Sequence, residues 1–400
     1  MGHRRRAVNK WTIHDVAVAG KRVLVRVDFN VPLDGTRITD DTRIRAALPT
    51  INALRAAGAR VVLLSHLGRP KGKVVAALRL APVAERLSEL LGTPVATAAA
   101  CIGPGAEAVV AGLRPGEVAL LENVRFHPEE ERNDPAFARA LAELGDLYVN
   151  DAFGAAHRAH ASTEGIAHVL PAVAGLLLER ELAVLGGALE QPERPFAAII
   201  GGAKVSDKIE VIDHLLTRVD ELLIGGGVAN TFLRAQGYEI GRSRHEPDKV
   251  ALAAELLERV GQSDCELLLP TDVVVAPEAA DDVPHQVFAV DQTPANGMIL
   301  DIGPQTTQHY VQAVESAHTV IWNGPLGLFE IEPFSAGTRA VAAAVGHCPG
   351  TTIVGGGDSI AAIEQAGLSD RITHVSTGGG ASLEFLSGRT LPGVAALADR

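Results

Sequence analysis

Two glycine-rich segments combine glycine with lysine and aspartate, namely Gly201–Lys208 (GGAKVSDK) and Gly355–Ser359 (GGGDS). Each follows a short apolar run that predicts a buried strand, Phe196–Ile200 and Thr351–Val354. Glycine lets the backbone approach a ligand closely and offer N–H groups to phosphate oxygens, and a helix starting after such a loop adds its positive end. Lysine supplies a mobile positive charge, and a carboxylate can hold Mg²⁺. The two segments therefore predict a polyphosphate site, although the chain contains no Walker loop.

Lys204 and Lys208 lie four residues apart in the first of these segments. We expect a helix to begin at Val205 or Ser206, with Ser206 or Asp207 as its cap. Both lysines would then lie at a helix start, where positive charge opposes the helix dipole. A bound anion explains this placement better than a solvated first turn does.

Other polar side chains have a functional and an ordinary interpretation. Asp358 is the candidate Mg²⁺ ligand, but the same carboxylate could cap a helix. Glu330 could hold a ribose diol or be an exposed carboxylate without a function. Asp28 and Asn30 could bind a hydroxyl group, or could form a turn before Pro32.

Cationic side chains follow the predicted strands of the first half. Ligands bind at the carboxyl ends of parallel strands, and guanidinium groups donate two parallel hydrogen bonds to phosphate or carboxylate. Taken singly each residue could be an ordinary surface residue, but their shared placement favours a site for a small, highly charged anion. The loops of the second half offer glycine, lysine and aspartate instead, which suits a nucleotide. The cationic set is Arg43, His66, Arg69, Arg125 and Arg158.

Short apolar runs alternate with longer helical patterns such as Thr42–Ala57 and Leu80–Leu91, which predicts parallel sheets covered on both faces. Four hundred residues suit two domains. The best boundary is Gly186–Pro195, where the pattern breaks between the helical run Leu176–Leu185 and a new strand. The predicted strands are Arg22–Val27, Arg60–Ser65, Val118–Asn123, Asp146–Asn150, Phe196–Ile200, Glu221–Ile224, Glu266–Leu269, Met298–Ile302, Thr319–Trp322, Thr351–Val354 and His374–Ser376.

The composition, 47% hydrophobic and 21% charged, is that of an ordinary globular protein. Its three cysteines lie far apart, which argues against a disulfide framework or a zinc ribbon and fits a reducing cytoplasm. We expect no membrane span, because no apolar run is long enough. Met1–Lys10 is basic but lacks a signal-peptide core, and we interpret it as a disordered tip.

The net charge of −12 hides a basic first segment, since residues 1–75 contain 15 Lys and Arg against 5 Asp and Glu. Nucleic-acid binding is one interpretation, but these residues are dispersed among apolar runs without interleaved aromatic residues. A small anionic ligand explains them better. His157 and His160 lack a nearby third ligand, so we do not expect them to bind a metal.

From Lys21 to Leu386 the chain resembles the phosphoglycerate kinase family. The resemblance implies a cytoplasmic, monomeric transferase of glycolysis that moves a phosphoryl group reversibly between 1,3-bisphosphoglycerate and ADP, giving 3-phosphoglycerate and ATP, with domain closure. It implies two doubly wound, Rossmann-like α/β domains joined by a hinge helix: residues 1–185 for the triose phosphate, with a tail of about 385–400 packed on it, and residues 186–384 for the nucleotide. The matching motifs are VRVDFNVP (Val25–Pro32), SHLGRP (Ser65–Pro70), LLENVRF (Leu120–Phe126), NDAFGAAHRAHAS (Asn150–Ser162), GGAKVSDKI (Gly201–Ile209), WNGPLGLFE (Trp322–Glu330), GGGDS (Gly355–Ser359) and STGGGAS (Ser376–Ser382).

The resemblance also implies roles for single residues. The substrates are small molecules, with Mg²⁺ on Asp358 and neither nucleic acid nor membrane as a partner. The implied catalytic residues are Arg43, Lys204 and Gly379. The triose anion is assigned to Asp28, Phe29, Asn30, Arg43, His66, Leu67, Gly68, Arg69, Arg125 and Arg158. The nucleotide is assigned to Lys204, Lys208, Asn323, Glu330, Gly356, Gly357, Asp358 and Ser359.

One position departs from the family pattern: many members have glycine where this chain has Ile299, which affects the nucleoside pocket. An acyl phosphate carries a good leaving group and ADP is already ionised, so we expect positioning and charge neutralisation without a general base. Two alternatives stay open, another ATP-dependent carboxylate or sugar kinase and a non-catalytic anion-binding module.

Overall fold

The computed structural model describes residues 9–400 and divides the chain into two compact units. The first unit contains the chain up to Gly186 together with Thr390–Arg400, and the second contains Gly187–Arg389. Most of the basic segment that we interpret as a disordered tip, residues 1–8, lies outside the described residues. Lys10 has defined contacts, because its Nζ donates to the carbonyl of Leu397 at 2.8 Å.

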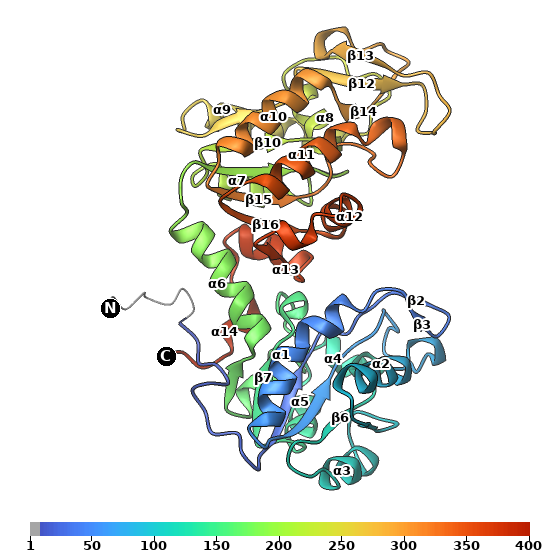
Figure 1. Cartoon of the computed structure of the whole chain (residues 1–400), viewed down its shortest axis with the longest axis vertical. Helices are drawn as coiled ribbons and strands as arrows, with labels where there is room; N and C mark the ends of the chain where they lie inside the picture. Colours follow the sequence, from blue (N-terminus) through green and yellow to red (C-terminus); the bar gives the residue numbers. More distant parts are fainter. Residues whose placement is uncertain (1–8) are drawn as a thin grey trace. The chain divides into compact units, whose positions relative to one another are not determined.

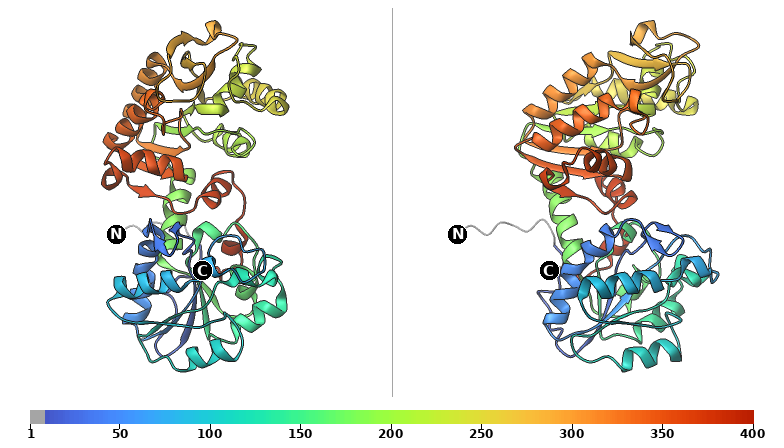
Figure 2. Two further views of the ribbon diagram at one scale, coloured as in Figure 1. Left: turned by 90° about the vertical axis from the view of Figure 1, so that its right-hand side faces the viewer. Right: turned by 45° about the vertical axis from the view of Figure 1, so that its right-hand side comes forward.

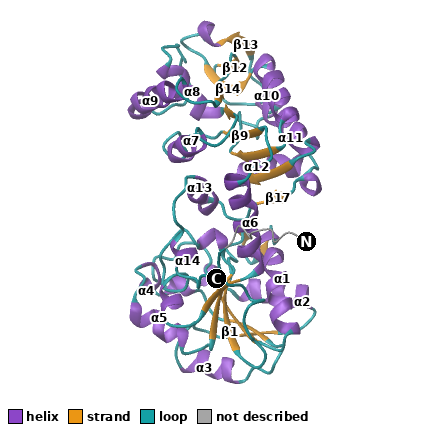
Figure 3. Ribbon diagram, turned by 90° about the vertical axis from the view of Figure 1, so that its left-hand side faces the viewer, coloured by secondary structure: helices purple, strands orange, loops and turns teal. Residues whose placement is uncertain are grey.

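A six-stranded parallel sheet forms the centre of the first unit (Figure 1). Its central strands β1 (Arg22–Arg26) and β4 (Arg60–Leu64) are largely apolar and buried. Helices cover both faces of the sheet, with α1 (Thr42–Ala56) and α2 (Ala81–Leu91) on one side and α4 (Pro128–Glu131) and α5 (Pro135–Ala142) on the other (Figure 3). In spatial order the strands are β5 (Val95–Thr97), β6 (Val118–Leu120), β4 (Arg60–Leu64), β1 (Arg22–Arg26), β7 (Leu147–Asn150) and β8 (Ala172–Ala174), beside a small hairpin of β2 (Leu33–Asp34) and β3 (Arg37–Ile38). The helices are α1 (Thr42–Ala56), α2 (Ala81–Leu91), α3 (Pro104–Ala111), α4 (Pro128–Glu131), α5 (Pro135–Ala142) and α14 (Pro392–Ala395).

The second unit repeats this plan with its own six-stranded parallel sheet. Figure 3 shows α10 (Pro304–Ser316) and α11 (Ala336–His347) on one side of its strands, and α7 (Ile209–Leu215), α8 (Gly226–Ala235) and α9 (Val250–Val260) on the other. In spatial order the strands are β11 (Glu266–Leu268), β10 (Glu221–Ile224), β9 (Phe196–Ile200), β15 (Thr319–Asn323), β16 (Thr351–Gly355) and β17 (His374–Val375). The helices are α7 (Ile209–Leu215), α8 (Gly226–Ala235), α9 (Val250–Val260), α10 (Pro304–Ser316), α11 (Ala336–His347), α12 (Gly357–Gln365) and α13 (Gly380–Leu386). The prediction of two doubly wound α/β domains is confirmed.

One predicted strand has a different role from the one expected. Met298–Ile302 is strand β14, but it lies antiparallel to β12 (Asp272–Ala276) in a separate three-stranded sheet with β13 (Gln286–Ala289). The alternation of strands and helices cannot reveal this change, because β14 is as apolar as the strands of the parallel sheets. This small sheet forms one wall of a cavity described below.

Helix α6 (Leu176–Glu190) crosses the boundary between the two units, which falls between Gly186 and Gly187, within the predicted boundary region. The helix does not end at Leu185 as the sequence pattern indicated, because it continues through both glycines. Side chains from elsewhere in the first unit cap its start. Asp151 Oδ1 accepts from the N–H groups of Leu177 and Leu178 at 2.9 and 3.2 Å, and Thr50 Oγ1 accepts from Leu176 N–H at 2.9 Å.

The last residues of the chain belong to the first unit, where both further views also place the C-terminus (Figure 2). Gly393 N–H donates to the carbonyl of Ala156 at 2.9 Å, and Asn150 Nδ2 donates to the carbonyl of Gly393 at 2.9 Å. Ala398 N–H donates to the carbonyl of Ala172 at 3.0 Å. These bonds hold the tail beside β7 and β8.

Candidate functional site

In the first unit the parallel register brings the loops with the predicted anion-binding residues to one edge of the sheet. Arg26, the last residue of β1, pairs with Leu64 of β4 and with Asn150 of β7. Asp28 and His66 therefore follow neighbouring strands at the same edge. We call the five side chains Arg43, His66, Arg69, Arg125 and Arg158 the cationic cluster.

Arg43 in the first turn of α1 forms an ion pair with Asp28, whose Oδ2 lies 2.9 Å from Arg43 Nη1. Burial would raise the pKa of the Asp28 carboxyl, but His66, Arg43 and Arg26 together hold it below its usual value. Asn30 lies in the same loop, and its Oδ1 accepts from Gly68 N–H at 2.8 Å. This loop therefore links two of the predicted substrate-binding segments.

His66 is not a solvated surface residue, because its side chain is buried and its Nδ1 lies 3.1 Å from Arg26 Nη2. Burial lowers the pKa of its imidazole well below the usual value, and the charges of Arg26, Arg125 and Arg43 add to this effect while Asp28 opposes it. The ring is therefore neutral at physiological pH. It can bind an anion as a hydrogen-bond donor but not as a cation.

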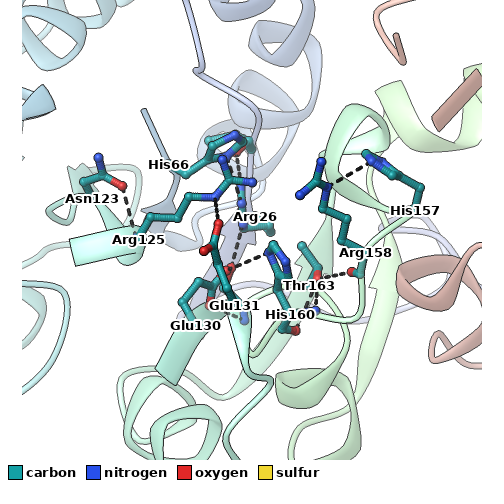
Figure 4. Close-up of polar contacts among 12 residues, drawn as sticks. Arg26, His66, Asn123, Arg125, Glu130, Glu131, His157, Arg158, His160 and Thr163 are labelled. Carbon is teal, nitrogen blue, oxygen red and sulfur yellow. Dashed lines mark hydrogen bonds and ion pairs between the residues drawn. The ribbon is translucent and has the colours of Figure 1, made fainter. Parts of the chain in front are cut away.

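The other arginines differ in burial. Arg125 is only 7% exposed; its Nη1 donates to the carbonyl of Gly68 at 3.0 Å, and burial lowers its pKa to about 10, so it stays charged. Arg158 is exposed, and its Nε donates to His157 Nε2 at 3.1 Å (Figure 4). Arg69 is exposed and directly follows Gly68. Within residues 9–400, Arg69 forms no hydrogen bond or ion pair with the rest of the cationic cluster.

Two predicted substrate-binding residues point into the core of the first unit. Phe29 and Leu67 are 0% and 2% exposed and belong to its main apolar cluster. Their side chains therefore position the loops, and only their backbone groups remain for a ligand.

The second unit contains a pocket of about 410 Å³ where the predicted polyphosphate segments meet. It lies at the carboxyl ends of β9, β15 and β16, whose register pairs Asn323 with both Ile200 and Gly355. The predicted residues that line it are Lys204, Lys208, Asn323, Gly356, Gly357, Asp358 and Gly379. We call this space the phosphate pocket.

The helix expected at Val205 or Ser206 begins later, at Ile209, with Lys208 at the N-cap position. The reason is that Ser206 donates both its N–H and its Oγ to the carboxylate of Glu246, at 2.7 and 2.6 Å. These bonds hold the residues just before Ile209 in a turn. The proposed capping by Ser206 or Asp207 is therefore wrong.

Lys208 donates to Asn323 Oδ1 in the wall of the phosphate pocket. Burial lowers the pKa of its ammonium group to about 8, while the nearby Asp207 and Asp358 act in the opposite direction. Asn323 Nδ2 is buried and has no hydrogen-bond partner within the described part of the chain. A polyphosphate here would meet a partly desolvated cation and an unused donor, which fits the predicted ligand.

The glycines of the phosphate pocket serve two different purposes. A Cβ on Gly201 would lie 2.1 Å from the carbonyl oxygen of Pro325, so glycine is needed there for close packing of two loops. A Cβ on Gly357, at the start of α12, would meet no atom within 4 Å. Ser359 is also structural, because its buried Oγ accepts from Gly324 N–H at 2.6 Å.

A second, largely apolar cavity of about 380 Å³ shares Gly202, Ala203 and Asp358 with the phosphate pocket and includes β14 in its wall. Glu330 lies at this cavity with an exposed side chain, and Ile299 contributes to the lining. Sequence reasoning missed Asn230, Arg244 and Asp301, which also line it. Asp301 is 2% exposed, and burial raises the pKa of its carboxyl to about 7.

Sequence reasoning also missed a buried polar chain beneath the cationic cluster, in which Ser162 links Arg26 to Glu130. Figure 4 shows Arg26 and Glu130 near His66 and Arg125. Arg26 gave a usable signal, because a charged residue within a continuously apolar strand needs a buried partner. Glu130 gave none, since it belongs to the acidic run Glu129–Glu131, which resembles an ordinary solvated surface.

Across residues 9–400, no three His, Cys, Asp or Glu side chains form a group that could hold a metal ion. A cation at Asp358 would therefore need phosphate and water oxygens as its other ligands, as Mg²⁺ commonly does. Within the same range, the helices are too short or too polar to cross a membrane.

Comparison with known proteins gives a consistent result. Residues 13–389 match the family model described as phosphoglycerate kinase. Curated proteins of that name from Moorella thermoacetica and a Roseiflexus species are 63% and 62% identical, covering 98% of this chain and 100% and 99% of their own length. The solved phosphoglycerate kinase structures from Coxiella burnetii and Pyrococcus horikoshii give TM-scores of 0.88 and 0.85 at 44% and 34% identity, each covering 97% of this chain and 98% of its own.

Proposed function

The chain belongs to the phosphoglycerate kinase family and is a kinase of glycolysis, and on that premise we propose how its residues carry out phosphoryl transfer. The reaction moves a phosphoryl group between 1,3-bisphosphoglycerate and ADP to give 3-phosphoglycerate and ATP. One observation carries the assignment of sites: the cationic side chains belong to the first unit, and the glycine-lined phosphate pocket belongs to the second.

We propose that the cationic cluster binds the triose anion. Arg125 and Arg158 supply charge for the phosphate and carboxylate groups, and the Arg125 guanidinium is partly desolvated, which strengthens its interactions. The loop of Asp28 and Asn30 accepts from and donates to the substrate hydroxyl. His66 contributes as a neutral donor.

The nucleotide is assigned to the second unit. Its phosphates occupy the phosphate pocket with Lys204, Lys208 and the backbone N–H groups that begin α12 and α13, and its nucleoside occupies the apolar cavity, with Glu330 at the ribose. Asp358 would hold Mg²⁺. When bound, the ion neutralises charge on the phosphates.

The chemistry needs no general base, because the acceptor oxygen of ADP is already ionised. Arg43 and Lys204, with the N–H groups near Gly379, stabilise the charge on the equatorial oxygens of the moving phosphoryl group. One preorganised donor of this kind is typically worth about 3–4 kcal/mol. Asp28 supports Arg43 by holding its guanidinium in the loop.

Because the two substrates are assigned to different units, transfer requires the units to bring them together and exclude water. X-ray scattering with both ligands should give a smaller radius of gyration than with either ligand alone, and unchanged scattering would contradict this proposal. We further propose a cytoplasmic monomer with neither nucleic acid nor membrane as a partner.

A coupled assay with 3-phosphoglycerate and Mg·ATP tests the assignment. We expect phosphorylation of 3-phosphoglycerate that stops when Mg²⁺ is chelated. ATP use only with a different acceptor would favour another carboxylate kinase. Salt-sensitive anion binding without turnover would favour a non-catalytic module.

A further inference from the structure

The buried polar chain beneath the cationic cluster has no part in the roles proposed so far. Arg26 and Glu130 are both 0% exposed, which is rare for charged residues unless they are paired. Arg26 Nε donates to Ser162 Oγ at 2.7 Å. Ser162 contacts Glu130 twice, with Oγ 2.6 Å from Oε1 and N–H 2.9 Å from Oε2.

The chemistry of Arg26, Ser162 and Glu130 determines which group donates each hydrogen bond. A guanidinium can only donate hydrogen bonds, so Ser162 Oγ must accept from Arg26 and direct its own proton to Glu130. Both oxygens of Glu130 then accept, which suits a carboxylate. Burial raises the pKa of this carboxyl, while Arg26, Ser162 and Arg125 oppose the rise. The carboxylate is therefore the buried counter-charge for Arg26.

His160 does not take over this role. Its Nδ1 lies 3.9 Å from Glu130 Oε1, but burial and the surrounding arginines lower its pKa to about 3, so its ring is neutral. Glu130 is thus balanced mainly by Arg26, and the position of Arg26 depends on Glu130 and Ser162.

At its other end Arg26 touches a residue of the cationic cluster. Its Nη1 donates to the carbonyl of Val27, and its Nη2 lies 3.1 Å from His66 Nδ1 (Figure 4). Because the guanidinium must donate, His66 Nδ1 accepts and carries no proton. The single proton of the neutral ring is then on Nε2.

We propose that Glu130 and Ser162 are positioning residues that fix Arg26 and, through it, hold His66 as the neutral Nε2–H tautomer for binding the triose anion. This inference rests on the proposed function, because it uses the assignment of His66 to the triose site. Its consequence is that His66 supplies a directed hydrogen bond whose strength does not change as pH passes the usual pKa of histidine. The charged groups that face His66 are Asp28, Arg26, Arg43 and Arg125.

Nitrogen-15 NMR of the full-length, histidine-labelled protein reports the tautomer directly, because protonated and unprotonated ring nitrogens have distinct shifts. From about pH 5.5 to about 8, wild-type His66 should show an unprotonated Nδ1 and a protonated Nε2. In Glu130→Gln the new amide would donate to Ser162 Oγ and disturb the hydrogen bonds that link Arg26 to Ser162 and to residue 130. We expect His66 to show a mixture of tautomers or to titrate within this range.

Steady-state kinetics provide a second test, through the KM values for the two substrates. In Glu130→Gln the KM for 3-phosphoglycerate should rise about tenfold or more, while the KM for ATP stays within about twofold. Glu129→Gln is the matched control, since Glu129 lies on the same helix with an exposed ion pair to Arg132, and it should change neither the spectrum nor the KM values.

The proposal is overturned if wild-type His66 carries its proton on Nδ1 or titrates near its usual pKa. A folded Glu130→Gln protein with the wild-type spectrum and KM also overturns it. Should Glu130→Gln fail to fold, Ser162→Ala decides the question, because it removes the link and keeps the charge; a wild-type spectrum then overturns the proposal. The spectrum is independent of turnover, so wild-type protein that fails to phosphorylate 3-phosphoglycerate would reject the proposed function alone.

Discussion

The two units offer different groups to the anions that we assign to them. In the first unit, the proposed site consists of side chains such as Arg125 and His66, which are buried and held by other polar groups. In the second unit, the proposed site consists largely of backbone at open glycines such as Gly357, together with Lys208. We therefore expect substitutions in the first unit to weaken binding by removing charge or by displacing side chains. Substitutions of glycine in the second unit should weaken binding by adding atoms to the pocket.

The largest effect is expected for Arg43→Ala. Removing this guanidinium deletes the proposed donor to the transferred phosphoryl group and leaves the Asp28 carboxylate without its ion-pair partner. Turnover should fall by about 10² or more, whereas the free energy of unfolding should change by less than about 1 kcal/mol. A coupled assay and a denaturant titration measure the two quantities.

Arg45→Ala is the control, because Arg45 lies on the same helix and forms an exposed ion pair with Asp41. It should retain nearly full turnover. If Arg43→Ala also retained nearly full turnover, the result would contradict the proposal that the charge of the Arg43 side chain is needed for phosphoryl transfer.

Two alanine substitutions in the second unit test the role of its open backbone. Gly357→Ala should raise the Kd for ADP about tenfold without loss of stability, because the added methyl would meet no protein atom within 4 Å and would occupy space that we assign to the phosphates. Gly201→Ala should instead destabilise the fold by about 1–3 kcal/mol or more, since its methyl would overlap the Pro325 carbonyl. Calorimetry and thermal melting separate the two outcomes, and unchanged ADP affinity in Gly357→Ala would remove the backbone from the site.

Lys208 predicts a pH dependence that the first site should lack. Its pKa is lowered to about 8, so the free protein loses this positive charge as pH rises through that value. ADP affinity should therefore fall by up to about tenfold between about pH 8 and about pH 9, with proton uptake on binding. Lys208→Arg, which stays charged, should flatten the profile in calorimetry; the same slope in this variant would assign the titration to another group.

The smallest effect concerns the helix that connects the two units and should change neither site. Asp151→Ala removes the acceptor for Leu177 and Leu178 at the start of α6 and should cost about 1 kcal/mol of stability. Asp151→Asn retains an acceptor oxygen and should cost less. Equal losses in the two variants, measured by urea unfolding, would show that the cap does not explain the effect.

The sequence predicted the parallel sheets well, because uninterrupted apolar strands such as Phe196–Ile200 have a clear pattern and parallel strands align their loops. It could not predict the antiparallel setting of Met298–Ile302, which depends on its partner strand. It placed the start of α7 too early because the bond from Ser206 to Glu246 spans 40 residues of sequence.

The candidate site shows the same limit. Arginines and glycines are recognisable by residue type and by their position after strands, and the structure brings most of them together in each unit. Glu130 and Asp301 were not predicted because only burial distinguishes them from surface carboxylates. Gly201 and Gly357 look alike in sequence, and only the neighbouring Pro325 carbonyl separates their roles.

Hydrogen–deuterium exchange of the full chain, with each ligand added alone, tests most directly whether the triose anion binds the first unit and the nucleotide binds the second. We predict that 3-phosphoglycerate slows exchange in the first-unit loops around Asp28, His66 and Arg125, and that Mg·ADP slows it at Gly201–Lys208 and at the start of α12. Protection of the glycine loops by 3-phosphoglycerate alone, or of the arginine loops by Mg·ADP alone, would contradict this assignment of the two substrates to the two units.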